Sequence, residues 1–83
     1  MYYSGEIKNI VYILRSQERM TQSDLAVELG ITRQTVAAIE NGKFLPSLEL
    51  AFEISHIFKR PIQEVFVFTP YEEENNNNKE DNK

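Results

Sequence analysis

The stretch from Gln22 to Asn41 constrains the fold of this 83-residue chain most strongly, because it predicts two short helices joined by a tight corner. Thr21 precedes the first helix, where its hydroxyl can accept a hydrogen bond from the backbone N–H of Asp24. Gly30 follows that helix and tolerates the positive φ that a sharp turn requires. Thr32 can cap the second helix in the same way.

Four positions in this stretch match the requirements of a helix-turn-helix. Ala26 is small, which suits the point where the two helix backbones cross closely. Gly30 stands at the corner, and Val36 and Ile39 are branched apolar residues that can seat the second helix. We therefore predict a helix-turn-helix motif at residues 22–41.

The segment TQSDLAVELGITRQTVAAIENGKFLPSLELA, which contains this motif, resembles the Xre/Cro/C1-type helix-turn-helix transcriptional regulators, and their small single-domain members in particular. The resemblance extends without gaps from about Ile7 to Phe66. It implies an all-α fold, a compact five-helix lambda-repressor-like DNA-binding domain. We expect this domain to occupy residues 1–68.

Three further helices are expected outside the motif. The first spans about residues 4–18 and is supported by an apolar stripe at Ile7, Ile10, Val11 and Leu14. The fourth begins after Ser47, a capping residue, and ends near residue 58 or 59. The fifth is short, at residues 61–66, and residues 67–69 could be extended.

The net charge of −4 gives no bulk support for a nucleic-acid partner. The acidity is concentrated at the end of the chain: residues 1–68 contain seven basic and eight acidic side chains, whereas residues 69–83 contain two basic and five acidic ones. The body is therefore close to neutral and permits DNA binding through a local basic patch. Residues 69–83 are charged and Asn-rich, so we expect a flexible, disordered acidic tail.

Composition also limits the compartment and the chemistry. The chain has no cysteine, which excludes a disulfide framework and a thiolate metal site. His56 is the sole histidine, and there is no Gly-rich phosphate loop, so we expect neither an enzyme nor a metal or cofactor site. The N-terminus lacks the apolar run of a signal peptide, and no segment approaches the roughly 20 apolar residues that span a bilayer. We expect a cytoplasmic protein without a membrane partner.

A helix-turn-helix places the N-terminal part of its second helix in the major groove of DNA. The side chains that Val36 and Ile39 leave outside should read the bases, and they are Thr32, Arg33, Gln34, Ala37 and Ala38. Arg33 can pair with guanine O6 and N7, and Gln34 with adenine N6 and N7.

Phosphate contacts are expected on both sides of that helix, from Gln22, Thr35, Asn41, Lys43 and Ser47. The roles of Gln22, Asn41 and Lys43 are implied by the resemblance. Thr32 and Ser47 can act as helix caps and as DNA contacts at once.

Arg15 and Glu40 allow two interpretations. Arg15 could contact DNA and Glu40 could repel it, but the resemblance implies a partly buried ion pair that joins the first helix to the end of the third. We favour the ion pair, which would leave a stranded charge if either partner were lost.

Two functions remain open from the sequence. The first is a sequence-specific regulator, which we expect to be a repressor, binding as a homodimer to half-sites about 34 Å apart. A surplus of apolar side chains offers either a dimer surface or a bulkier monomer core, and its members are Phe52, Ile57, Val67 and Phe68. The alternative is a protein-interaction module, such as an antitoxin, whose acidic tail binds a protein partner.

Overall fold

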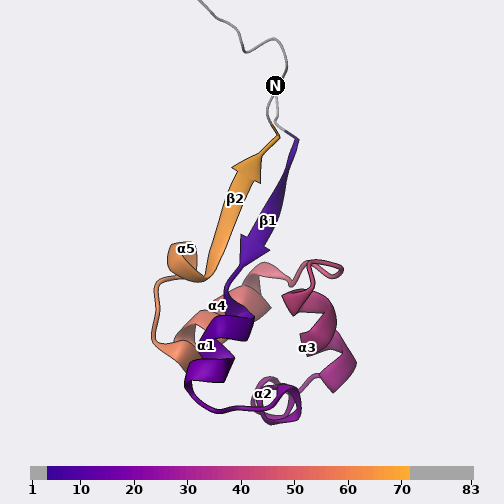
Figure 1. Cartoon of the computed structure of the whole chain (residues 1–83), viewed down its shortest axis with the longest axis vertical. Helices are drawn as coiled ribbons and strands as arrows, with labels where there is room; N and C mark the ends of the chain where they lie inside the picture. The colour runs from indigo at the N-terminus through magenta and orange to yellow at the C-terminus, as the bar shows by residue number, and fades with distance from the viewer. Residues whose placement is uncertain (1–3, 72–83) are drawn as a thin grey trace, which may run out of the picture.

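The computed structural model describes residues 4–71, which form five helices and a two-stranded antiparallel sheet (Figure 1). The elements in chain order are β1 (Gly5–Asn9), α1 (Val11–Gln17), α2 (Gln22–Leu29), α3 (Arg33–Glu40), α4 (Leu48–Phe58), α5 (Ile62–Val65) and β2 (Phe66–Pro70). The helical domain agrees with the expected fold class, whereas the sheet was not expected. Most of the predicted acidic tail, residues 72–83, lies outside the described residues.

A single apolar core joins the helices. Leu25 and Val65 are its most deeply buried members, each with an exposed fraction of 0 %. Each of the five helices contributes to the core, and its buried members are Val11, Leu14, Leu25, Ala26, Val36, Ile39, Ile54 and Val65. Because each helix is short, its stability comes from burying one face against the others rather than from helix propensity alone.

The predicted first helix, at about residues 4–18, is wrong in its first half. Residues 5–9 form β1, and α1 covers only Val11–Gln17. The stripe that includes Ile7 and Ile10 fits a helix locally, but Ile7 lies opposite Phe68 of β2 and is part of the sheet. The side chain of Asn9 marks the change, because its Oδ1 accepts a hydrogen bond of 3.0 Å from the backbone N–H of Val11. Asn9 thereby satisfies a donor in the first turn of α1.

The two strands form a ribbon that projects from the helices (Figure 1). Gly5 lies opposite Pro70, and Asn9 lies opposite Phe66. A Cβ atom on Gly5 would lie 2.6 Å from the backbone oxygen of Thr69 and 2.7 Å from Cα of Pro70, so glycine is required for this close approach. Residues 69 and 70, which we assigned to the tail, belong to β2.

The predicted helix caps are confirmed. Thr21 Oγ1 accepts a hydrogen bond of 2.9 Å from the Asp24 N–H, and the Asp24 carboxylate accepts one of 2.9 Å from the Thr21 N–H. Hydrogen bonds from Thr21 to the Asp24 carboxylate, first from its backbone N–H and then from its side chain, lower the pKa of Asp24. Thr32 and Ser47 cap α3 and α4 by accepting hydrogen bonds from backbone N–H groups three residues on.

The end of α4 offers a stability test. Lys59 has φ 57° and ψ 44°, the left-handed conformation in which a side chain costs about 1 kcal/mol or more. We expect Lys59→Gly to raise the free energy of unfolding by about 0.5–1 kcal/mol, measured by urea denaturation. Lys59→Ala removes the same charge and keeps the strained φ, so it should give no such gain. Equal effects of the two substitutions would contradict this explanation.

Candidate nucleic-acid interface

The crossing of α2 and α3 has the geometry that the sequence predicts for a helix-turn-helix. Ala26 of α2 is 4 % exposed, and Val36 and Ile39 on the inner face of α3 are each 1 % exposed. Gly30 has φ 70° and ψ 31°, and no atom lies within 4 Å of the position that a Cβ would take. Gly30 is therefore needed for its backbone conformation rather than for space. The N–H of Ile31 closes the corner by donating to the Ala26 carbonyl at 3.0 Å.

The outer surface of α3 presents the residues predicted to read bases. Thr32, Arg33 and Gln34 are exposed at its N-terminal end, whereas Ala37 and Ala38 are half-buried further along. The Thr32 hydroxyl is engaged with Thr35, because their Oγ1 atoms lie 2.9 Å apart and Thr32 Oγ1 also accepts from the Thr35 N–H. Arg33 and Gln34 are therefore the polar side chains of this end that do not bond to Thr32 or Thr35.

Four of the five predicted phosphate contacts lie near the two ends of α3, and the fifth, Thr35, lies within its first turn. Gln22 is the first residue of α2 and lies beside the N-terminal end of α3, where Arg33 Nη1 donates to Gln22 Oε1 at 3.3 Å. Asn41, Lys43 and Ser47 are exposed after the C-terminal end. Because α3 has eight residues, about 12 Å of helix separates the two groups.

Arg15 and Glu40, which the sequence analysis paired, join α1 to the last residue of α3. Arg15 Nε lies 2.7 Å from Glu40 Oε2, and Arg15 Nη2 donates to Glu40 Oε1 at 3.2 Å. The two side chains are 11 % and 4 % exposed. The hydrogen bond to Glu40 raises the pKa of Arg15, so the guanidinium stays charged. Arg15 Nη1 also donates to the Met20 carbonyl at 2.8 Å, which fixes the turn before α2.

Gln22 has a structural partner that the sequence did not indicate. Its Nε2 donates to Glu40 Oε1 at 3.1 Å, while its Oε1 accepts from Arg33. A continuous chain of polar contacts therefore runs from Arg15 through Glu40 and Gln22 to Arg33. This chain connects the partly buried ion pair to the exposed end of α3.

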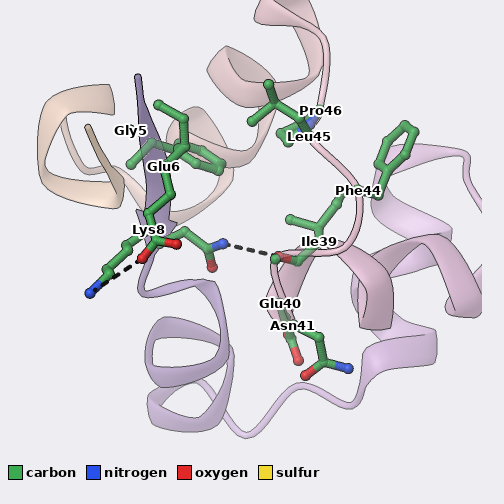
Figure 2. Close-up of a pocket in the computed structure, with 13 residues that line it drawn as sticks. Gly5, Glu6, Lys8, Ile39, Glu40, Asn41, Phe44, Leu45 and Pro46 are labelled. Atoms are coloured by element: carbon green, nitrogen blue, oxygen red, sulfur yellow. Dashed lines mark hydrogen bonds and ion pairs between the residues drawn. The ribbon is translucent and has the colours of Figure 1, made fainter. Parts of the chain in front are cut away.

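Asn9 is a second residue whose role the sequence analysis missed. Its Nδ2 donates to the Ile39 carbonyl at 3.0 Å (Figure 2, dashed line at Ile39), and its Oδ1 accepts from the Val11 N–H in the first turn of α1. The Ile39 carbonyl also accepts from the Gly42 N–H at 3.0 Å, so the Asn9 amide adds a second hydrogen bond to this carbonyl in the last turn of α3. Asn9 therefore ties the base of the ribbon to the end of α3. Asn9 lies one residue before the N-cap of α1, which is Ile10, so the usual N-cap pattern does not point to its contact with Val11.

None of the helices within residues 4–71 is long and apolar enough to cross a membrane. The same part of the chain holds no group of three or more His, Cys, Asp or Glu side chains placed to bind a metal ion.

Comparison with known proteins identifies the family. A family model described as "Helix-turn-helix" matches residues 11–65. An uncharacterized HTH-type transcriptional regulator of Methanocaldococcus jannaschii is 45 % identical over 62 residues, covering 75 % of this chain and 94 % of the relative. The uncharacterized HTH-type transcriptional regulator YgzD of Bacillus subtilis is 45 % identical over 60 residues, covering 72 % of this chain and 91 % of YgzD.

A solved structure supports the fold. The crystal structure of a Bacteroides fragilis protein superposes with a TM-score of 0.66 at 17 % sequence identity, covering 72 % of this chain and 97 % of that one. The family model and the two relatives confirm the resemblance seen in the sequence. The chain belongs to the Xre/Cro-type helix-turn-helix family.

Proposed function

We propose that this chain is a sequence-specific double-stranded DNA-binding transcriptional regulator that inserts α3 into the major groove. One observation carries the proposal: Arg33 and Gln34 stand exposed together at the N-terminal end of α3, on a helix that Val36 and Ile39 hold in place. The N-terminal part of the second helix is the part that a helix-turn-helix presents to base edges. The names of the relatives, which call them HTH-type transcriptional regulators, agree with this function.

Base reading would rest on few side chains. Arg33 has the bidentate geometry for guanine, and Gln34 for adenine. Ala37 and Ala38 offer methyl contacts to a thymine methyl group. Because the hydroxyl groups of Thr32 and Thr35 bond to each other, their contacts with DNA would contribute less to specificity than those of Arg33 and Gln34. Part of the specificity would then come from DNA shape.

The backbone of the DNA would be held at both ends of α3. Gln22 and the free N–H groups of the first turn of α2 lie at one end, and Asn41, Lys43 and Ser47 at the other. With few positive side chains available, affinity should depend on placing these groups in register along the duplex. Salt should weaken binding with a modest slope, because a small number of phosphates is neutralised.

We infer that the protein acts as a repressor and as a homodimer. Occupancy of the operator by the helix-turn-helix domain is the simplest way for such a regulator to act on transcription. Two copies would read half-sites about 34 Å apart, one turn of the double helix.

Selection from a pool of random duplexes tests the function. The full chain should enrich a roughly palindromic sequence over bulk DNA, and the affinity for that sequence should exceed the affinity for a scrambled duplex by about a thousandfold or more. Salt weakens the phosphate contribution on both duplexes alike. Measuring both duplexes at two salt concentrations therefore separates this contribution from base reading, which is the difference in affinity between the two duplexes. Failure to enrich any sequence would contradict the proposal.

A further inference from the structure

The outer edge of β1 is an open strand edge beside a groove. The groove has a volume of about 560 Å³ and separates β1 from the loop after α3 (Figure 2). Every residue of β1 lines it, and Phe44, Leu45 and Pro46 form part of the opposite wall. A two-stranded ribbon is marginally stable by itself, and an unpaired edge invites another strand.

The hydrogen-bond pattern shows which backbone groups of β1 face outward. The Ile10 N–H donates to the Val65 carbonyl, and the Tyr71 N–H donates to the Ser4 carbonyl. In an antiparallel pair the bonded positions alternate, so Glu6 and Lys8 bond toward β2. The backbone N–H and C=O groups of Gly5, Ile7 and Asn9 therefore point away from β2. Pro70 lies opposite Gly5, where its missing N–H costs no bond within the ribbon.

We propose that this edge pairs with β1 of a second copy of the chain, antiparallel and centred on Ile7. This deepens the homodimer of the proposed function by naming its interface. A two-fold axis at Ile7 brings Ile7 opposite its counterpart as a hydrogen-bonded pair, and Gly5 opposite the second copy's residue 9. The two ribbons then form one four-stranded sheet.

The charges of β1 select this register. Glu6 and Lys8 flank Ile7 and lie on the same face of the strand, and within one chain their charged groups are 3.5 Å apart. With the axis at Ile7, the Glu6 of each copy faces the Lys8 of the other, which gives two cross-strand pairs of opposite charge. An axis at Glu6 or at Lys8 would put like charges opposite each other, which is destabilising in a sheet. The sequence GEIKN is therefore self-complementary in this register.

Apolar surface supports the same arrangement. Ile7 and Phe68 lie opposite each other and thus share one face of the ribbon, and Phe68 is 48 % exposed. Pairing through β1 places the corresponding faces of the two ribbons side by side, so that the Ile7 side chains meet. Phe52 and Ile57, the other apolar residues considered for a dimer, line a separate groove with Glu28 and Leu29 of α2.

Charge reversal tests the pairing on the full chain by sedimentation equilibrium at low salt. Glu6→Lys makes both cross-strand pairs lysine–lysine, and Lys8→Glu makes both pairs glutamate–glutamate. Each variant alone should dissociate about tenfold more readily than the native chain. An equimolar mixture should recover a tight heterodimer, because one strand is then wholly positive and the other wholly negative.

Glu53→Lys is the matched control, since it makes the same charge change at an exposed position of α4. It should leave dimerisation unchanged, and circular dichroism should show that all variants are folded. A monomeric native chain, equal behaviour of Glu6→Lys and Glu53→Lys, or a mixture that does not associate would each overturn the interface. DNA selection is a separate readout: a monomer that enriches a sequence would refute this interface and leave the DNA-binding function standing.

Discussion

Replacing Glu40 with alanine is expected to lower the free energy of unfolding by about 3–5 kcal/mol, because the substitution leaves the charge of Arg15 buried without its partner. Arg15 is 11 % exposed and donates to both carboxylate oxygens of Glu40. The amide of Gln22 loses its acceptor as well. Glu40 is also the last residue of α3, where the helix dipole disfavours a negative charge. The contact with Arg15 therefore offsets the unfavourable interaction between the Glu40 carboxylate and the helix dipole.

Urea denaturation measures this effect, and Glu53→Ala provides the control. Glu53 is exposed on α4, so removing its carboxylate should change stability by less than about 0.5 kcal/mol. The double variant Arg15→Met with Glu40→Leu should recover much of the loss, since it removes both buried charges together. Similar losses for Glu40→Ala and Glu53→Ala would show that the ion pair does not hold α1 to α3.

The helix-turn-helix could be predicted from the sequence because its signals are local. Thr21 and Thr32 cap helices through backbone groups three residues away, and Gly30 supplies a positive φ at its own position. Ser47 marks the start of α4 for the same reason. Each of these rules needs only neighbouring residues, so the bounds of α2, α3 and α4 follow from the chain itself.

The ribbon could not be predicted with the same certainty because a strand depends on a partner far away in the chain. Ile7 pairs with Phe68, and nothing near Ile7 specifies that contact. The alternation of Glu6, Ile7 and Lys8 is typical of a strand but is too short to outweigh a helical stripe that includes Ile10. Extended structure at residues 67–69 was a possibility in the sequence, yet its partner was not.

The candidate interface likewise combines features that local sequence predicts with contacts between residues far apart in the chain. Exposure of Arg33 and Gln34 follows from the spacing of Val36 and Ile39 on one helix. The contacts that Gln22 makes with Glu40 and Arg33 join residues 18 and 11 positions apart, so they arise only when the helices have packed. The roles of these side chains toward DNA stay predictions.

Arg33→Ala should weaken binding to the selected duplex by about 10- to 100-fold, because a bidentate pair with guanine contributes about 1–3 kcal/mol of discrimination. Binding to a scrambled duplex should change far less. The substitution should have little effect on folding, since Arg33 is exposed and its one hydrogen bond, to Gln22, is 3.3 Å long. Fluorescence anisotropy with both duplexes, at the same salt concentration, gives the two affinities.

The comparison between the duplexes separates base reading from a simple phosphate contact. If Arg33 met only a phosphate, both affinities would fall together and the salt slope would decrease by about one. Arg60→Ala removes the same charge from an exposed residue paired with Glu64 at 3.7 Å, outside α3. It should therefore leave the ratio of the two affinities unchanged. If α3 reads bases, the ratio of the affinity for the selected duplex to that for the scrambled duplex falls for Arg33→Ala and stays the same for Arg60→Ala. Equal losses of affinity on both duplexes for Arg33→Ala would refute base reading by this residue.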